Sequence, residues 1–123
     1  MPVLDVEIVG AVPAAARRRM AGRIADAAGA VLGAPLGNTW VRLRFLPSAQ
    51  YAESGGGPPR GVRPVFVALL QRRPPRGRSL ARLTRALTGA VARACRRPAG
   101  NVHVIHRAAA GGRAAFGGTL LPR

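Results

Sequence analysis

The chain has 123 residues, with 20 arginines, no lysine and four carboxylates, so its formal net charge is +16. This length fits one domain, and with 48% apolar residues that domain can bury a core without disulfides. The absence of lysine excludes a Walker-type phosphate loop and Schiff-base chemistry, and the single cysteine, Cys95, excludes an internal disulfide or a multi-cysteine zinc site. The start has no basic region or long apolar run, so we expect a soluble, cytoplasmic protein with no membrane partner.

Most of the positive charge lies in the second half of the chain. Residues 58–123 hold fourteen arginines and no carboxylate, whereas residues 1–57 hold six arginines and all four carboxylates. Arg, Ala, Gly and Pro all use GC-rich codons, and we attribute most of the total charge to that bias. Local arginine clusters remain open to a function in binding an anion, either a small carboxylate or nucleic acid.

The first half alternates between two kinds of periodicity. Val3–Val9 alternates apolar residues between two faces, which predicts a half-buried strand. Pro13–Gly33 has the apolar spacing of one helical face, and Gly33 and Pro35 end it. Thr39–Leu46 alternates again, which predicts a second strand. A Gly/Pro-rich stretch, residues 54–63, then breaks all periodicity and is interpreted as a linker.

The same order of elements returns after the linker. Pro64–Leu70 resembles a strand, and a second helix is expected from near Ser79, a good N-cap, to Pro98. Asn101–Arg107 is expected to be a fourth strand, and Arg113–Leu121 a closing hairpin that contains glycines.

The two halves repeat each other within one domain, residues 1–123. Pro-Val at 2–3 matches Pro-Val at 64–65, and strand, helix and strand follow at a nearly constant offset, which defines units 2–53 and 64–121. We therefore predict an α+β fold in which duplicated β-α-β units form a four-stranded sheet with two helices on one face. The other face of the sheet needs cover, and we expect association of subunits to supply it, with Trp40 and the apolar strand residues as candidates for that interface.

Pro2 is a candidate catalytic group. Methionine is normally removed before a residue this small, which leaves Pro2 as a free secondary amine. An α-amino group has a pKa of about 8, and burial beside arginines lowers it further, since both effects disfavour the ammonium form. A neutral amine is suited to moving a proton on carbon next to a carbonyl.

At this point the sequence resembles the tautomerase superfamily, whose β-α-β units begin at a catalytic amino-terminal proline. The similarity to 4-oxalocrotonate tautomerase (4-OT) runs without a gap from Pro2 to about Gly55, through the turn Leu32-Gly-Ala-Pro-Leu36. It resumes at Pro64 and includes the closing segment Val102–Gly118 with its Gly-Gly hairpin. The resemblance implies the fused two-unit form, a homotrimer, and no metal or organic cofactor.

The resemblance implies roles for several residues. Pro2 matches the catalytic base, and Tyr51 falls where short tautomerases have an active-site aromatic residue. The family arginine after the first strand falls near Val12 and is missing, but the matching turn of the second half contains Arg72 and Arg73, which we expect to bind a substrate carboxylate.

The second-strand arginine of the short enzymes is also absent. Its positions hold Trp40, an interface or pocket-wall candidate, and His103, which is placed to polarise a carbonyl unless its role is structural. His103 and His106 are three residues apart on one strand, so they face opposite sides and cannot share a metal ion.

The expected function is tautomerisation, a keto–enol or 1,3-proton transfer on a small 2-oxo or 2-hydroxy carboxylic acid. Family branches that add water use a late carboxylate, and none follows Glu53, which favours proton transfer without hydration. Two alternatives stay open: a tautomerase scaffold without activity, and a basic nucleic-acid-binding module. Nucleic acid is the less expected partner, because five aromatic residues are few for base stacking.

Overall fold

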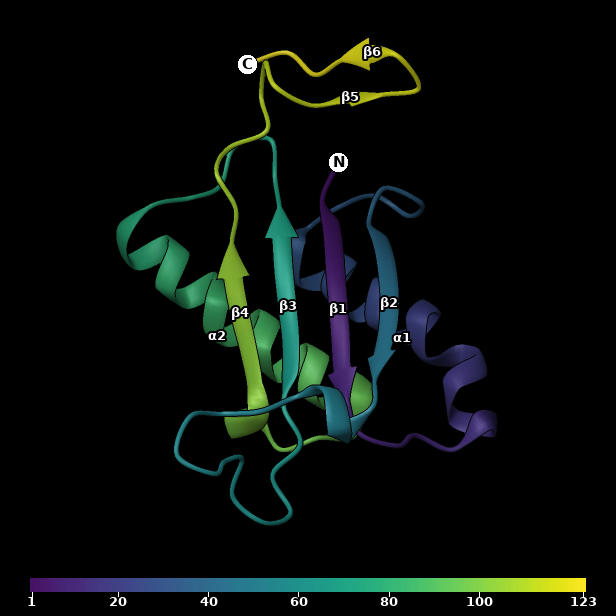
Figure 1. The fold of residues 1–123 in the computed structure, drawn as a ribbon. Coiled ribbons are helices and arrows are strands. Elements are labelled where there is room, and N and C mark those ends of the chain that lie inside the picture. The colour runs from purple at the N-terminus through teal and green to yellow at the C-terminus, as the bar shows by residue number, and fades with distance from the viewer.

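Four strands form one mixed sheet in the computed structural model, which describes residues 1–123. They are β1 (Val3–Val9), β2 (Trp40–Leu46), β3 (Val65–Leu70) and β4 (Val102–His106), in the order β2-β1-β3-β4 (Figure 1). β1 pairs with β2 and β3 with β4 in parallel, and β1 pairs with β3 antiparallel. Each half is thus a parallel β-α-β unit, and the two units meet at the centre of the sheet.

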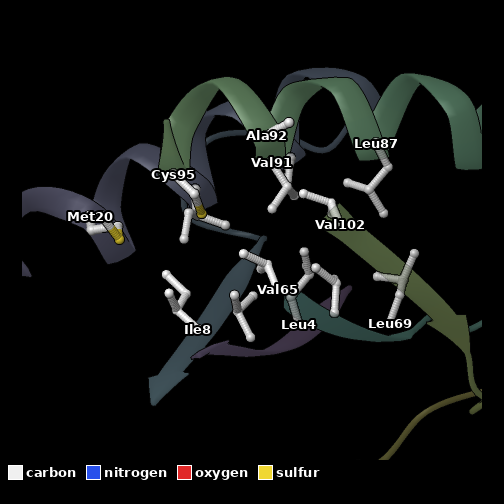
Figure 2. Packing of buried hydrophobic residues seen from close by; sticks show 14 residues of the cluster. Leu4, Ile8, Met20, Val65, Leu69, Leu87, Val91, Ala92, Cys95 and Val102 are labelled. Carbon is white, nitrogen blue, oxygen red and sulfur yellow. The ribbon is translucent and has the colours of Figure 1, made fainter. Parts of the chain in front are cut away.

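Two helices, α1 (Ala14–Leu32) and α2 (Gly77–Cys95), pack against each other on one face of this sheet (Figure 1). The alternation of β1 turns Leu4, Val6 and Ile8 toward them. Figure 2 shows the resulting core, in which residues from the helices meet residues from the strands. The core comprises Leu4, Val6, Ile8, Met20, Ile24, Ala28, Val65, Val67, Leu69, Leu87, Val91, Ala92, Cys95 and Val102. The α+β prediction with both helices on one face is confirmed.

The helix ends agree with the sequence prediction except at the start of α2. α1 ends at Gly33, whose φ of 64° lies in the left-handed region that favours glycine. α2 begins at Gly77, two residues before Ser79, so the helix starts close to the predicted position but the prediction of Ser79 as its N-cap is wrong. The extended residue Arg76 caps α2 instead, and its carbonyl accepts a hydrogen bond from the Leu80 N–H at 3.3 Å. Ser79 therefore lies within the first turn of α2.

The rest of the chain forms short elements. Two 3₁₀ helices, η1 (Ser48–Gln50) and η2 (Ala99–Asn101), precede the 54–63 segment and β4, respectively. The strands β5 (Ala115–Phe116) and β6 (Thr119–Leu120) form the closing hairpin that the glycine pattern predicts. Neither helix combines the length and apolar character that a membrane crossing requires.

The sheet face opposite the helices carries an ion pair between its first two strands. Asp5 on β1 pairs in register with Arg42 on β2, and the Arg42 guanidinium donates two hydrogen bonds to its carboxylate, at 2.6 and 2.9 Å. These hydrogen bonds, together with the positive charges of Arg42, Arg107 and Arg44, lower the pKa of Asp5 below its ordinary 3.8, against the opposing effect of desolvation. The ionised carboxylate therefore stabilises the folded state.

Replacing Asp5 with Asn is expected to lower the thermal midpoint at neutral pH. A carboxyl whose pKa is lower when folded stabilises the protein above its unfolded pKa, and that contribution is lost as the pH falls through the folded pKa. The difference in midpoint between wild type and Asp5→Asn should thus shrink as the pH is lowered from 5 to 2. Thermal unfolding followed by circular dichroism measures it. Glu7→Gln, on the same face of β1 and without an ion pair, is the control, and equal pH profiles for the two variants would contradict the assignment.

Candidate functional site

Pro2 lies at the end of the sheet where β3 and β4 finish. Its carbonyl accepts a hydrogen bond from the Trp40 N–H at 3.0 Å, which fixes it beside the start of β2. The antiparallel β1–β3 ladder ends at the pair Val3–Leu70, so Pro2 and Gln71 each lie one residue beyond it, at the same end of the sheet. Arg72 and Arg73 follow Gln71 directly. The topology therefore brings Pro2 and the two expected carboxylate-binding arginines to one end of the molecule.

Arg72 and Arg73 line a cleft of about 430 Å³ at this end. Two further arginines, Arg113 and Arg123, and the small residues Ala109, Gly111 and Gly112 complete its wall. Arg72 donates from Nε to the Pro122 carbonyl at 2.9 Å and from Nη2 to the Arg123 carbonyl at 2.8 Å, and Arg73 also donates to the Arg123 carbonyl. The two guanidiniums are thus aimed together at carbonyl oxygens of the last two residues.

The β5–β6 hairpin crosses the Pro2 end of the sheet. It follows β4 at one edge, yet Phe116 in β5 packs edge-on against Trp40 on β2 at the other edge, with ring centroids 5.2 Å apart. Figure 1 shows the hairpin lying beyond the sheet on the side of the N-terminus. Trp40 is further held by its indole N–H, which donates to the Gly37 carbonyl at 3.1 Å. The hairpin therefore extends over the end where Pro2, Arg72 and Arg73 lie.

Tyr51 and His103 lie toward the opposite end of the sheet. Both pack against Phe66 at the start of β3, with ring centroids 5.7 Å (Tyr51) and 5.4 Å (His103) from it. Phe66 precedes Leu70 by four residues, or about 13 Å of extended strand. The Tyr51 hydroxyl donates to Glu53 at 2.7 Å, and this hydrogen bond raises the pKa of Tyr51 above 10. One copy of the chain does not bring Tyr51 or His103 together with Pro2.

No protein-family model matches this chain, and no curated protein sequence does. Solved structures are similar over nearly the full length. A native fused 4-OT is 21% identical, covers 96% of this chain and 94% of its own, and has a TM-score of 0.73. A second fused 4-OT, solved as a symmetric trimer, is 25% identical over 85% of this chain and 83% of its own, with a TM-score of 0.65. A malonate semialdehyde decarboxylase inhibited by 3-bromopropiolate is 18% identical over 94% of this chain and 88% of its own, with a TM-score of 0.72.

The chain has the fused, two-unit fold of the tautomerase superfamily. The same fold is found in a macrophage migration inhibitory factor-like protein from Entamoeba histolytica, at 11% identity and a TM-score of 0.71 over 97% of each chain. The structural neighbours are therefore enzymes and relatives of the tautomerase superfamily.

Within this tautomerase fold, His103 and His106 lie on opposite faces of β4. The His106 Nε2 lies 2.8 Å from the Thr84 hydroxyl on α2, so His106 faces the helix layer, whereas His103 faces Phe66 on the other side. The prediction that they point in opposite directions is confirmed. No three His, Cys, Asp or Glu side chains gather in an arrangement that could hold a metal ion.

The sequence does not predict that three residues lie at the Pro2 end of the tautomerase fold. Phe116 gives no signal because its contact with Trp40 depends on the path of the hairpin. Arg113 lies within the predicted hairpin, but its place in the cleft depends on the same path. The Gln71 side-chain oxygen is buried without a hydrogen-bond partner, one residue beyond the Val3–Leu70 pair that ends the β1–β3 ladder. Of these three residues, only Gln71 has a clue in the sequence, because it directly precedes Arg72 and Arg73.

Proposed function

We propose that this protein is a cofactor-independent tautomerase in which Pro2 is the general base. The observation that supports this most strongly is that Pro2, Arg72 and Arg73 all lie at one end of the sheet, the end that the β5–β6 hairpin crosses. Met1 precedes Pro2 in the structure, so its peptide bond makes the Pro2 nitrogen an amide. The base forms when Met1 is removed and the secondary amine is freed.

The proposed reaction is a 1,3-proton transfer on a small 2-hydroxy-2-enoic acid. The Pro2 nitrogen takes the enol proton, the C2–oxygen bond becomes a carbonyl, and the proton is returned to C3. The product is the 2-oxo acid, with no net gain or loss of atoms. The positive charges of Arg72 and Arg73 favour the neutral amine that the first step needs.

The arginine pair suits the carboxylate of this substrate class. A planar guanidinium binds a carboxylate through two parallel hydrogen bonds, and Arg72 already directs its Nε and Nη2 at two carbonyl oxygens. A substrate carboxylate placed there would replace the Pro122 and Arg123 carbonyls as the acceptor. Within one copy of the chain, Glu53 accepts a hydrogen bond from Tyr51 at the opposite end of the sheet and therefore lies away from Pro2.

We further propose a homotrimer assembled through the helix-free face of the sheet. Fused 4-OT proteins are solved as symmetric and asymmetric trimers. The helix-free face exposes large apolar side chains at Trp40, which is 43% exposed, and Ile105, which is 57% exposed. A site that uses Tyr51 together with Pro2 requires the Tyr51 end of one copy to meet the Pro2 end of another, and an assembly through this face permits it.

The direct test combines mass spectrometry with an assay of phenylenolpyruvate ketonisation. The intact mass should show loss of Met1, and the native mass should be about three times the 12.8 kDa of one chain. The Met1-free protein should ketonise phenylenolpyruvate or a 2-hydroxydienoate well above the uncatalysed rate. A Met1-free trimer with no turnover on several such acids would overturn the proposal and favour a scaffold without activity.

A further inference from the structure

Four arginines of α2 and the arginine that caps its C-terminus lie on the solvent side of the helix, and we call them the helix-face arginines. They are Arg78, Arg82, Arg85, Arg93 and Arg96, all exposed. Their spacing of three or four residues, interrupted at Gly89, confines them to an arc of roughly 80° at 100° per residue. The core residues Leu87 and Val91 lie on the other side of α2, so the helix-face arginines face away from the sheet.

The helix-face arginines have no counter-ion within the chain. None forms an ion pair or a side-chain hydrogen bond. Of the four carboxylates, Asp5 and Glu7 are on the helix-free face of the sheet and Glu53 is bonded to Tyr51. The fourth, Asp26, is an exposed residue of α1 and forms no ion pair with any of these arginines. Like charges three or four residues apart repel each other along a helix, so this arrangement destabilises α2 until an external anion neutralises it.

The charged surface continues across to α1. Arg19 and Arg23 of α1 line a shallow hollow of about 350 Å³ together with Arg96 of α2. Arg96 has a φ of 54°, a left-handed conformation that favours glycine, and the equivalent position after α1 is Gly33. The residue that caps the C-terminus of α2 is thus an arginine, whereas the residue that caps the C-terminus of α1 in the first unit is a glycine.

We infer that the helix-face arginines, continued by Arg19 and Arg23, bind the phosphate backbone of a nucleic-acid duplex independently of its sequence. The helix-face arginines span about 27 Å from Arg78 to Arg96, which equals roughly eight base pairs of B-form DNA. Apart from arginine, the exposed residues of α2 are all small, namely Gly77, Ser79, Ala81 and Ala86, whereas Leu80 and Leu83 are half-buried. The surface therefore lacks the large apolar side chains that enter a membrane, and backbone binding needs no aromatic platform for stacking.

This binding surface is separate from the proposed tautomerase site. It lies on the outer side of the helix layer, whereas Pro2 lies at one end of the sheet and the proposed trimer contact uses the helix-free face. An assembly through that face leaves the helix-face arginines accessible. The inference therefore stands whether or not the protein is a tautomerase.

The test measures binding of a fluorescent 18-base-pair DNA duplex by anisotropy between 50 and 300 mM salt. We expect linear loss of log affinity with log salt and equal affinity for duplexes of unrelated sequence. Arg82→Gln combined with Arg85→Gln should reduce the salt slope by about two and weaken binding roughly ten- to a hundredfold at 100 mM salt. Ketonisation of phenylenolpyruvate by this variant should equal that of wild type.

The matched control removes the same charge elsewhere. Arg60 lies in the 54–63 segment and Arg113 in the hairpin region, and neither side chain forms a hydrogen bond or ion pair. Arg60→Gln combined with Arg113→Gln should bind the duplex within about threefold of wild type. Equal losses in both double variants would overturn the inference, because they would show attraction by net charge alone. Tighter binding to the single strand, or to vesicles of anionic lipid, would overturn it as well.

Discussion

Pro2→Ala should lower kcat/KM for phenylenolpyruvate ketonisation by two to four orders of magnitude in the Met1-free protein, the usual contribution of a positioned general base. The variant keeps an amino-terminal amine, so some activity should remain. What it loses is the proline ring and the position that the Trp40 N–H bond to the Pro2 carbonyl and the β1–β3 ladder give its nitrogen. Steady-state kinetics on protein whose intact mass confirms removal of Met1 provides the measurement.

Pro64→Ala is the matched control for this experiment. Pro64 occupies the position equivalent to Pro2 in the second unit, but its nitrogen is an internal amide and is unable to accept a proton from a substrate. Pro64 is buried directly before β3, so its replacement can affect folding, and the thermal midpoint of the Pro64→Ala variant is measured alongside the kinetics. Folded Pro64→Ala should retain wild-type kcat/KM. If Pro2→Ala were as active as Pro64→Ala, Pro2 would not be the base.

Replacing Arg72 and Arg73 together with Gln should reduce kcat/KM by about a hundred- to a ten-thousandfold relative to wild type, mainly through KM. Each charge-assisted hydrogen bond to a carboxylate contributes about 1.5–3 kcal/mol, and both guanidiniums face the same cleft. Arg72→Lys should restore only part of the loss, because an ammonium group lacks the planar pair of donors that matches a carboxylate.

A control is needed to distinguish two roles of Arg72 and Arg73, binding of the substrate carboxylate and stabilisation of the C-terminal residues. Arg72 and Arg73 also bond the Pro122 and Arg123 carbonyls, so a purely structural role predicts a lower thermal midpoint with little change in KM. Arg76→Gln removes one positive charge from the same loop, at an exposed residue without such contacts, and it should leave KM within about twofold. Equal KM values for the double variant and Arg76→Gln would contradict the proposed role.

The sequence predicts the elements of this fold well because the signals are local. The alternation of Leu4, Val6 and Ile8 decides which face of β1 is buried, and the spacing of Met20, Ile24 and Ala28 does the same for α1. The start of α2 is the exception. Ser79 is a good cap by residue type, but the chain already turns helical at Gly77, because Arg76 is extended and its carbonyl accepts the first helical bond.

The candidate site is less predictable because it is made by contacts between distant segments. Pro2, Arg72 and Arg73 are all apparent in the sequence, and the repeat of β-α-β units suffices to place them at one sheet end. Phe116 is not apparent, because only the path of the hairpin across the sheet brings it to Trp40. No periodicity encodes that path.

The sequence by itself determined the two β-α-β units, the buried face of each strand and helix, and the concentration of arginine in the second half. These follow from periodicity and composition, which act within a few residues along the chain. The tertiary structure decided which charges find partners: Arg42 pairs with Asp5, Arg72 and Arg73 meet the last two carbonyls, and the helix-face arginines meet none. It also placed Tyr51 and His103 far from Pro2. Those outcomes depend on strand order and hairpin path, since electrostatic pairing requires proximity in space, not in sequence.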